Sequence, residues 1–375
     1  MSLLLAGELP VLIDHGRIEA IGAEADRRAA GAGRFDATGL RVAPGFIDLQ
    51  INGACGHDFT QEPSAIWEVG AALVKYGVTA FLPTIVSSRI SAVEAGRAAV
   101  AERPTGYRGA EPLGLHLEGP FLSPAHRGAH DADRLLAPDR AVADDWAPPN
   151  GVRMVTLAPE LPGALELIEL LTGREVVVGL GHSGASASQA EAAIDAGARY
   201  ATHLFNAMPP MHHRDPGLAG QVLVDSRVTV GLIADGVHVD PAMLAIAWRQ
   251  LGPKRWSTVT DAVAAFGARG GQFTVGELPL DVGEDAPRLA DGRLAGSTLS
   301  LDQAVRNVVR FTGCSVVDAL ATVTATPAAL LGLPDRGRLE AGARADLVLL
   351  NKNLEVVATF VVGEAAYVAE DAAWR

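Results

Sequence analysis

Cysteine is scarce in this 375-residue chain, which has only two, and neither belongs to a CxxC pair. Cys55 and Cys314 lie far apart in the sequence, so the chain has no disulfide framework and suits a reducing compartment. Long hydrophobic runs are absent too, because nowhere do the about 18 apolar residues of a membrane-spanning helix follow one another. The first residues lack the basic start and cleavage site of a leader peptide. We therefore expect a cytoplasmic protein that does not enter a membrane.

Positive charge is the second scarce feature. Lysine and arginine total 31 against 44 aspartates and glutamates, which gives a formal net charge of -13. So acidic a chain repels a nucleic-acid backbone and an anionic membrane surface, and we expect neither as a partner. The only lysines are Lys75, Lys254 and Lys352. An anionic substrate would therefore have to be met by a few placed arginine or histidine side chains.

Hydrophobic residues are plentiful, at 49% of the chain, so the protein can bury a large core as one big domain or two unequal ones. Between residues 44 and 331, short apolar runs alternate with alanine-rich helical stretches. This alternation is typical of repeated βα units around a parallel sheet, and eight such units close an α/β barrel, the (β/α)8 barrel of the TIM type. The eight runs are residues 44–51, 79–86, 113–119, 152–160, 175–182, 200–205, 228–235 and 256–262.

A doubly wound open sheet also alternates strands and helices, but a glycine-rich nucleotide turn usually follows its first strand. Residues 52–56 (NGACG) lack that GxGxxG pattern, which favours the closed barrel. Both ends of the chain are rich in β-structure, because residues 8–21 predict two short strands and residues 336–364 predict three. Residues 267–297, rich in glycine and aspartate, predict a β-hairpin that leaves the barrel after its eighth strand.

Three chelating side chains follow three different predicted strands, at the end where barrel enzymes place their active sites: Glu118, His182 and His203. Two imidazoles and one carboxylate leave a catalytic zinc an open position for water. Taken alone, the glutamate could pair with an arginine, and a histidine in a glycine turn is more often a hydrogen-bonded loop residue. Their convergence favours a metal site. The first strand ends in Gln50 and Asn52 instead of histidines, and no lysine lies at a strand end, so we expect one metal.

Asp261 follows the eighth predicted strand, where a carboxylate could take a proton from water and later give it to a leaving group. The alternative is an N-cap for the next segment, a position that aspartate favours. Residues 202–220 gather Asn206, Arg214 and three histidines, which in so acidic a chain could form an anion site or a solvated loop. His130 and His238 are further candidates for contacts with a substrate oxygen or phosphate.

Several motifs together resemble those of the N-acetylglucosamine-6-phosphate deacetylases, a family of the amidohydrolase superfamily. The most specific stretches are HLEGPF, HLFNAM with the later RDPGLAG, and ADGVH, and the similarity runs from about residue 44 to residue 351. The stretch ARADLVLL marks only the wider superfamily. The resemblance implies a metal-dependent barrel of residues 44–331 and a small β-sandwich domain built from residues 1–43 and 332–375.

The resemblance also assigns the chemical roles. It implies that Glu118, His182 and His203 bind one divalent metal ion, zinc in the first place and iron or cobalt as alternatives. It implies that Asp261 is the catalytic acid and base. Some members of the family carry two histidines at the end of the first strand and bind two metals. Gln50 and Asn52 stand there in this chain, as the remnant of a second site, and resemble the single-metal type.

Substrate contacts are implied in the same way. His130 matches the position near the acetyl group, Asn206 and Ala207 match contacts through amide or backbone, and His238 and Arg214 match contacts to the phosphate. In the family, the arginine of this loop reaches the substrate of the neighbouring subunit, so a homodimer with shared sites is implied. The expected reaction removes acetate from N-acetyl-D-glucosamine 6-phosphate and leaves D-glucosamine 6-phosphate.

Two other functions stay open. The chain could be another hydrolase of the superfamily, such as an N-acetylgalactosamine-6-phosphate deacetylase or an N-acyl-amino-acid or cyclic-amide enzyme, since a fold alone does not fix the substrate. It could also be a non-catalytic barrel that serves as a binding or assembly module. Such a chain would tend to have lost its metal ligands, whereas this one keeps three chelating residues and the aspartate.

Overall fold

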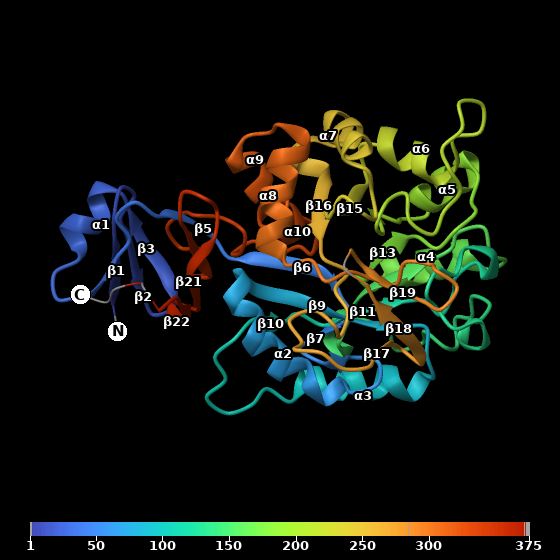
Figure 1. Cartoon of the computed structure of the whole chain (residues 1–375), viewed down its shortest axis with the longest axis horizontal. Coiled ribbons are helices and arrows are strands. Elements are labelled where there is room, and N and C mark those ends of the chain that lie inside the picture. The colour runs from blue at the N-terminus through green and yellow to red at the C-terminus, as the bar shows by residue number, and fades with distance from the viewer. Residues whose placement is uncertain (1, 284, 371, 373–375) are drawn as a thin grey trace.

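The computed structural model describes residues 2–283, 285–370 and 372, and in it the chain forms two bodies of unequal size (Figure 1). The larger body is a barrel of strands surrounded by helices. The smaller body, on the left of Figure 1, contains the first and the last strands of the described chain.

Eight parallel strands form the barrel in the described chain, one from each predicted run, which confirms the predicted fold class. They are β6 (Phe46–Ile51), β9 (Val78–Val86), β11 (Leu115–Glu118), β12 (Val152–Leu157), β13 (Val177–Leu180), β14 (Tyr200–Ala201), β15 (Thr229–Ile233) and β16 (Trp256–Val259). A short strand, β10 (Glu111–Pro112), lies beside β9. Every residue of β6 and β9 is buried, as expected for strands that are covered on both faces.

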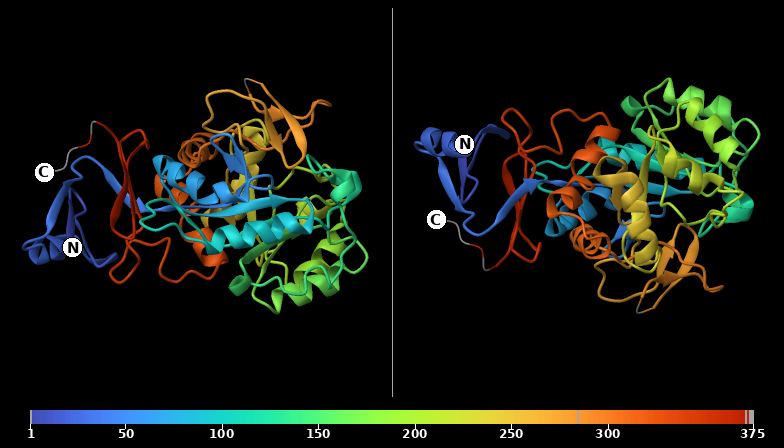
Figure 2. Two further views of the ribbon diagram at one scale, coloured as in Figure 1. Left: turned by 90° about the horizontal axis from the view of Figure 1, so that it is seen from below. Right: turned by 90° about the horizontal axis from the view of Figure 1, so that it is seen from above.

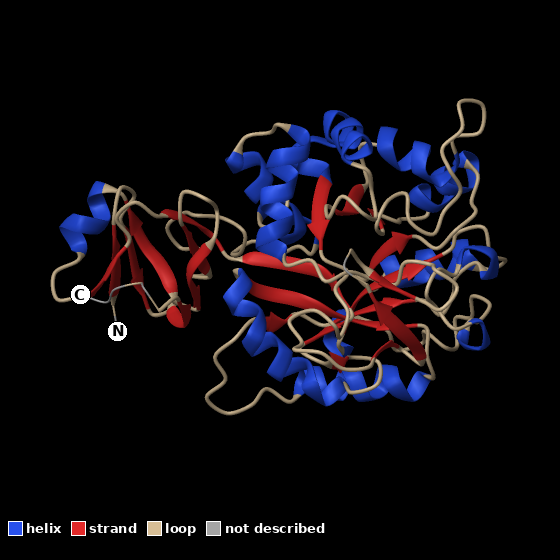
Figure 3. Cartoon of the chain, viewed as in Figure 1, coloured by secondary structure: helices blue, strands red, loops and turns tan. Residues whose placement is uncertain are grey.

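Helices follow most of these strands and cover the outside of the barrel (Figure 3). They are α2 (Ile66–Leu73), α3 (Ile90–Ala101), α4 (Ala164–Thr172), α5 (Ala187–Asp195), α6 (Gly217–Val224), α7 (Pro241–Arg255), α8 (Leu301–Thr312), α9 (Val316–Ala321) and α10 (Ala325–Leu330). The sequence sets some of their starts: Ser186 and Gln189 form a capping box that opens α5. No helix in the described part of the chain is long and apolar enough to cross a bilayer.

The small body is a sandwich of two sheets. One sheet has the order β3 (Arg17–Ile21), β2 (Val11–Asp14), β1 (Leu3–Ala6), β4 (Gly33–Asp36), and the other has the order β22 (Glu364–Val368), β21 (Val356–Val361), β20 (Leu347–Leu350), β5 (Arg41–Pro44). Phe35 of the first sheet meets Phe360 of the second edge to face, with ring centroids 5.5 Å apart, inside a shared apolar core. The sandwich built from both ends of the chain is therefore as predicted. The domain boundaries at 43/44 and 331/332 stay a prediction.

One predicted strand of this body does not form. Residues 336–346 are turns and bends, joined to the first sheet by an isolated bridge between Arg17 and Arg344. Gly337 and Gly342 have φ of 69° and 88°, and this left-handed backbone interrupts an extended strand. Conversely, β1 and the short helix α1 (Ala23–Arg28) were not predicted from the sequence.

The predicted hairpin after the eighth barrel strand is present, with a third short strand. β17 (Phe273–Val275) pairs with β18 (Leu278–Val282), which pairs with β19 (Pro287–Arg288), all antiparallel. We call residues 267–297 the excursion. Figure 2 shows it, in orange, standing out from the barrel on one side. Its apolar residues Val275 and Leu289 pack with Val86 of β9 and Val263, so it is anchored at the rim of the barrel.

The barrel closes between its last strand and its first. The backbone N–H of Asp261 donates to the carbonyl of Gln50 at 2.9 Å, and that of Asn52 donates to the carbonyl of Ala262 at 2.7 Å. Below them, the hydroxyl of Thr260 donates to the carboxyl group of Asp48 at 2.6 Å. The buried Asp48 thus links the two strands directly beneath the residues that follow them.

Asp48 gives the fold a pH dependence. Burial raises the pKa of this carboxyl group from 3.8 to about 7, although hydrogen bonds from Thr260 and from the backbone of Gln50 oppose the change. The stabilisation by the protonated group is complete below the unfolded pKa of 3.8 and is lost as the pH rises through about 7. The loss amounts to at most about 1.4 kcal/mol per pH unit.

We predict that Asp48→Asn removes this loss. The asparagine oxygen can still accept the backbone N–H groups, and its amide can donate to Thr260. The free energy of unfolding of the variant, minus that of the wild type, should therefore increase as the pH rises between about 4 and about 7. Urea unfolding of metal-depleted protein at several pH values measures it, with the exposed Asp139→Asn as control. A difference that does not change with pH would contradict the role given to Asp48.

Candidate active site

The carboxyl ends of four barrel strands bring four of the predicted site residues to one place, as the barrel fold leads one to expect. Glu118 is the last residue of β11. His182 and His203 come two residues after β13 and β14, and Asp261 comes two residues after β16. All four are buried.

Three of these residues have an unusual backbone. The φ angles of His182, His203 and Asp261 are 50°, 29° and 51°, in the left-handed region that side chains other than glycine seldom adopt. Neighbouring loops hold this conformation: the N–H of Ser123 donates to the carbonyl of His182 at 3.0 Å, and that of Ser297 donates to the carbonyl of Asp261 at 2.8 Å. Strained backbone at three equivalent strand ends is typical of a functional site.

The carboxylate of Glu118 is the centre of the cluster. Its Oε1 lies 3.0 Å from His182 Nε2 and 2.9 Å from His203 Nε2, and the two nitrogens lie 3.0 Å apart. Burial alone would raise the pKa of the Glu118 carboxyl group, but hydrogen bonds and charge from the two imidazoles hold it well below its usual range. The group is therefore a buried anion, and it needs positive charge beside it.

A hydrogen bond behind the ring of His182 determines which of its nitrogens has a free lone pair. Nδ1 lies 3.1 Å from the backbone carbonyl oxygen of His126, which can only accept, so the proton of the neutral ring is assigned to Nδ1. In the neutral ring Nε2 carries no proton, so its lone pair is available to a metal ion in place of the hydrogen bond to Glu118. This is the usual arrangement of a histidine that binds a metal ion.

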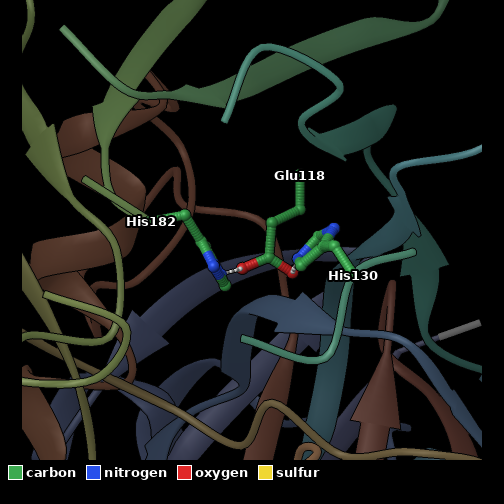
Figure 4. A group of neighbouring side chains, drawn as sticks. All are labelled: Glu118, His130 and His182. Carbon is green, nitrogen blue, oxygen red and sulfur yellow. Dashed lines mark hydrogen bonds and ion pairs between the residues drawn. The ribbon is translucent and has the colours of Figure 1, made fainter. Parts of the chain in front are cut away.

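His130 has the opposite arrangement. Its Nδ1 accepts the backbone N–H of Ser87 at 3.2 Å, so the proton of the neutral ring is assigned to Nε2. Burial lowers the pKa of His130 to about 3, which keeps the ring neutral. Nε2 lies 3.8 Å from Glu118 Oε2, and Figure 4 shows His130 and His182 on either side of the carboxylate. His130 is therefore placed to donate a hydrogen bond into the site.

Two amide side chains orient Asp261. Gln50 Nε2 lies 3.1 Å from Asp261 Oδ1 and Asn52 Nδ2 lies 2.7 Å from the same atom, while Gln50 Nε2 also lies 3.0 Å from Glu118 Oε1. Burial and the charge of Glu118 raise the pKa of Asp261 to about 6. A carboxyl group with such a pKa can both take up and release a proton near neutral pH.

The donor set could hold one divalent metal ion. Ligand atoms about 2.0–2.2 Å from one ion lie roughly 3 Å or slightly more from each other. The three atoms of Glu118, His182 and His203 are separated by 3.0 Å or less, so a small outward movement would fit them to an ion. Glu118, His130 and His182 also have ligand atoms within 4.8 Å of one another, but the protonated Nε2 of His130 is a donor and not a ligand. Gln50 and Asn52 turn N–H groups toward the carboxylates, where a second metal would require lone pairs.

A cavity of about 340 Å³ opens above the cluster. The predicted site residues among those that line it are Asn52, Glu118, His130, His182, His203, Asn206, Ala207, His238 and Asp261. Gln50 lies beneath them, fully buried. The ring of His238 is held by Asp235, whose Oδ2 lies 2.6 Å from its Nδ1, so Nε2 is the nitrogen left for a ligand. One end of the cavity thus carries the metal-binding candidates and the wall includes a histidine suited to an anion.

Arg214 is the predicted site residue that the structure does not bring to the cavity. It is exposed in the loop after β14, where its Nη1 lies 2.9 Å from Nε2 of the neighbouring His213. Met211 of the same loop is 45% exposed, Val224 of α6 is 66% exposed and Ile246 of α7 is 48% exposed. These three apolar side chains line one surface depression. Arg214 is not among the residues that line it.

Several residues of the site were not predicted from the sequence. The excursion contributes Val275, Arg293, Leu294 and Gly296 to the cavity wall, although its sequence indicated only a hairpin. Ser87, which fixes the ring of His130, follows β9 directly. A serine after a predicted barrel strand is a signal that could have been used, whereas nothing in the sequence of the excursion shows which way it folds.

Comparison with known proteins places this geometry among enzymes. Residues 41–366 match the amidohydrolase family. An N-acetylglucosamine-6-phosphate deacetylase of Bos taurus is 42% identical over 362 residues, which cover 92% of this chain and 88% of that protein. An N-acetylgalactosamine-6-phosphate deacetylase of Escherichia coli O157:H7 is 36% identical over 330 residues, which cover 87% of this chain and 87% of that protein.

A solved structure agrees over nearly the whole length. It is an aspartate-to-alanine variant of N-acetyl-D-glucosamine-6-phosphate deacetylase from Mycobacterium smegmatis, in complex with N-acetyl-D-glucosamine 6-phosphate. The two structures match with a TM-score of 0.88 at 36% identity, covering 98% of this chain and 100% of that chain. The likeness therefore includes both the barrel and the sandwich.

Proposed function

The chain belongs to the amidohydrolase family, and on that premise we propose that it hydrolyses the acetamide of N-acetyl-D-glucosamine 6-phosphate. Water adds its oxygen to the acetyl carbonyl carbon, the C–N bond breaks, and the sugar nitrogen gains a proton, so the products are acetate and D-glucosamine 6-phosphate. The observation that carries the proposal is the convergence of Glu118, His182 and His203 beside Asp261 at the base of one cavity.

Glu118, His182 and His203 would hold the metal ion. When bound, a divalent ion lowers the pKa of a coordinated water to about 7 and polarises a carbonyl group. Two imidazoles and a carboxylate suit zinc best and also accept iron or cobalt. A single ion per subunit follows from the amide N–H groups of Gln50 and Asn52, which occupy the place of further ligands.

Asp261 is the proton carrier in this proposal. It accepts a proton from the attacking water and later gives it to the departing sugar nitrogen, so one carboxyl group acts first as base and then as acid. Both amide donors bond the same oxygen, Oδ1, and thereby fix the orientation of the carboxyl group. The N–H of His130 Nε2 donates to the acetyl oxygen, on which negative charge develops.

The phosphate is assigned to His238 and to Arg214 of the partner subunit, with Asn206 and Ala207 contacting the sugar from the cavity wall. Arg214 is exposed outside the cavity of its own subunit, in the same loop as Met211, which lines an apolar surface depression together with Val224. An exposed apolar surface beside a charged loop suits the interface of a homodimer. The arginine would then complete the site of the neighbouring copy.

N-acetyl-D-galactosamine 6-phosphate is the second candidate substrate, because one relative is named for it and the two sugars differ only at C4. A non-catalytic barrel is disfavoured, since the chain keeps a complete donor set and the aspartate. We place the reaction in the cytoplasm, where the two free cysteines would stay reduced.

The metal site can be tested by analysis of bound metal. We predict that His203→Asn lowers the metal content of the purified protein well below one ion per subunit, because it removes a ligand. His130→Asn should retain the ion, because it removes only a hydrogen-bond donor. Elemental analysis after gel filtration gives both values, and circular dichroism confirms that each variant is folded. If His203→Asn keeps the metal ion and His130→Asn loses it, His130 is a metal ligand and His203 is not.

The substrate can be tested by the release of acetate. We expect rapid release from N-acetyl-D-glucosamine 6-phosphate, and a kcat/KM lower by about a hundredfold or more, roughly 2.7 kcal/mol, for the sugar without phosphate. N-acetyl-D-galactosamine 6-phosphate is assayed beside them under the same metal supply, and Asp261→Asn is the inactive control that keeps its metal. If neither phosphorylated sugar reacts while the protein holds one ion, the substrate assignment is wrong.

The shared site can be tested by mixing two defective variants. Arg214→Ala lacks the arm that completes the partner's site, and Asp261→Asn lacks the proton carrier of its own. In a mixed dimer one site is intact, so an equal mixture that exchanges subunits should reach about a quarter of wild-type activity, since half of the dimers are mixed. If the mixture is no more active than the two variants assayed separately, Arg214 acts in the site of its own subunit or in neither site.

A further inference from the structure

Arg293 is a cavity residue to which the proposed reaction gives no role. It lies in the tight turn of the excursion that follows β19, where the N–H of Gly292 donates to the carbonyl of Leu289 at 2.8 Å. Among the described residues that line the cavity, it is the only arginine or lysine. Its side chain is 38% exposed, so it forms part of the wall and is not part of the core.

The guanidinium group of Arg293 joins two separate segments. Nε lies 2.8 Å from Asp291 Oδ2, and Nη2 lies 2.6 Å from the same oxygen, which fixes the group to its own turn. Nη1 donates to the backbone carbonyl of Gly128, a residue 165 positions earlier in the chain. Gly128 belongs to the loop between β11 and β12 that carries His126 and His130.

Gly128 lies directly against the ring of His182. A Cβ atom on this glycine would be 3.0 Å from Cε1 and 3.3 Å from Nδ1 of that ring, and the φ of Gly128 is 55°. Two residues earlier, the carbonyl of His126 accepts a hydrogen bond from Nδ1–H of His182 at 3.1 Å. Two residues later, His130 lies with its ring centroid 4.5 Å from that of His182. A displacement of Gly128 would therefore move both histidines or the groups that orient them.

A second link supports the same contact between the excursion and the loop. Arg134 Nη2 lies 2.7 Å from Glu277 Oε2 at the tip of the β17–β18 hairpin. Ala129 also packs against the apolar cluster that contains Val275 and Leu289. The excursion is thus fastened to the loop at both ends, and Arg293 makes the contact nearest to the chemical centre.

We propose that Arg293 is a positioning residue, which holds the His126–His130 loop against His182 and so fixes the hydrogen-bond donor of His130 and the bare nitrogen of His182. This rests on the proposed function, because it assigns the consequence to the hydrolysis of the acetamide. A role as a direct ligand of the phosphate is disfavoured, since three of the five N–H groups of the guanidinium are used by Asp291 and Gly128 and its charge is paired.

The test compares Arg293→Ala with a matched control on the same excursion. Arg288 is equally exposed, at 39%, and bonds only Asp285 and the carbonyl of Gly292 in the contacts described, so Arg288→Ala removes an arginine without touching the loop. Because a misplacement of catalytic groups by about 1 Å costs up to a hundredfold, we expect kcat to fall at least about tenfold in Arg293→Ala with KM nearly unchanged. Arg288→Ala should match the wild type. Arg293→Lys keeps one donor for the carbonyl of Gly128 and should recover part of the loss.

Two further readouts separate this role from others. The preference for the phosphorylated over the unphosphorylated sugar should be the same in Arg293→Ala as in the wild type; a preference that collapses would make Arg293 a phosphate ligand and overturn the proposal. Hydrogen exchange of the amides of residues 126–130 should become faster in Arg293→Ala and not in Arg288→Ala, and unchanged exchange would also overturn it. Acetate release by the wild type is the reference, and its absence would refute the proposed function, whereas the exchange experiment needs no turnover.

Discussion

The buried carboxylate of Glu118 is the group on which the organisation of the site depends. Taking an anion out of water is costly, and here the cost is offset by two imidazoles and an amide that converge on a single oxygen. The barrel makes this possible because its strands end side by side, so residues distant in the sequence share one small volume. Removing the carboxylate would leave several polar groups without a partner, and leaving it uncompensated would destabilise the fold. A divalent ion bound at the same place would balance the charge of the carboxylate and would be a partner for the two imidazole nitrogens.

Outer hydrogen bonds then give chemically identical side chains different roles. The backbone carbonyl behind His182 accepts a hydrogen bond, and the backbone N–H beside His130 donates one. In the neutral rings, the nitrogen that faces the site therefore offers a lone pair in His182 and an N–H in His130. In the sequence His182 follows a predicted strand and His130 does not, but neither position shows which ring nitrogen carries the proton. Their roles follow from what the loops place behind them, which is why the fastening of those loops has consequences for catalysis.

The sequence was a good guide wherever a strand carried the information. All eight barrel strands, and Glu118, His182, His203 and Asp261 at their ends, follow from the repetition of apolar runs. Prediction was poorer where structure depends on loops. The left-handed backbone of three strand ends, the turn of Gly337 and Gly342, and the wall formed by the excursion depend on contacts between distant segments, which a pattern of hydrophobicity does not contain.

The charges around the cavity explain why a second copy of the chain matters to the proposal. Glu118 and Asp261 are carboxylates at its base, the charge of Arg293 is paired with Asp291, and the ring of His238 is held by Asp235. A phosphate that brings nearly two further negative charges would therefore meet little unpaired positive charge from the described residues of one subunit. With a net charge of -13, the chain has few cations to spare. In the proposed homodimer, the exposed Arg214 would supply the missing charge, because the association that would bury the apolar side chains of this region would also bring its guanidinium group to the phosphate.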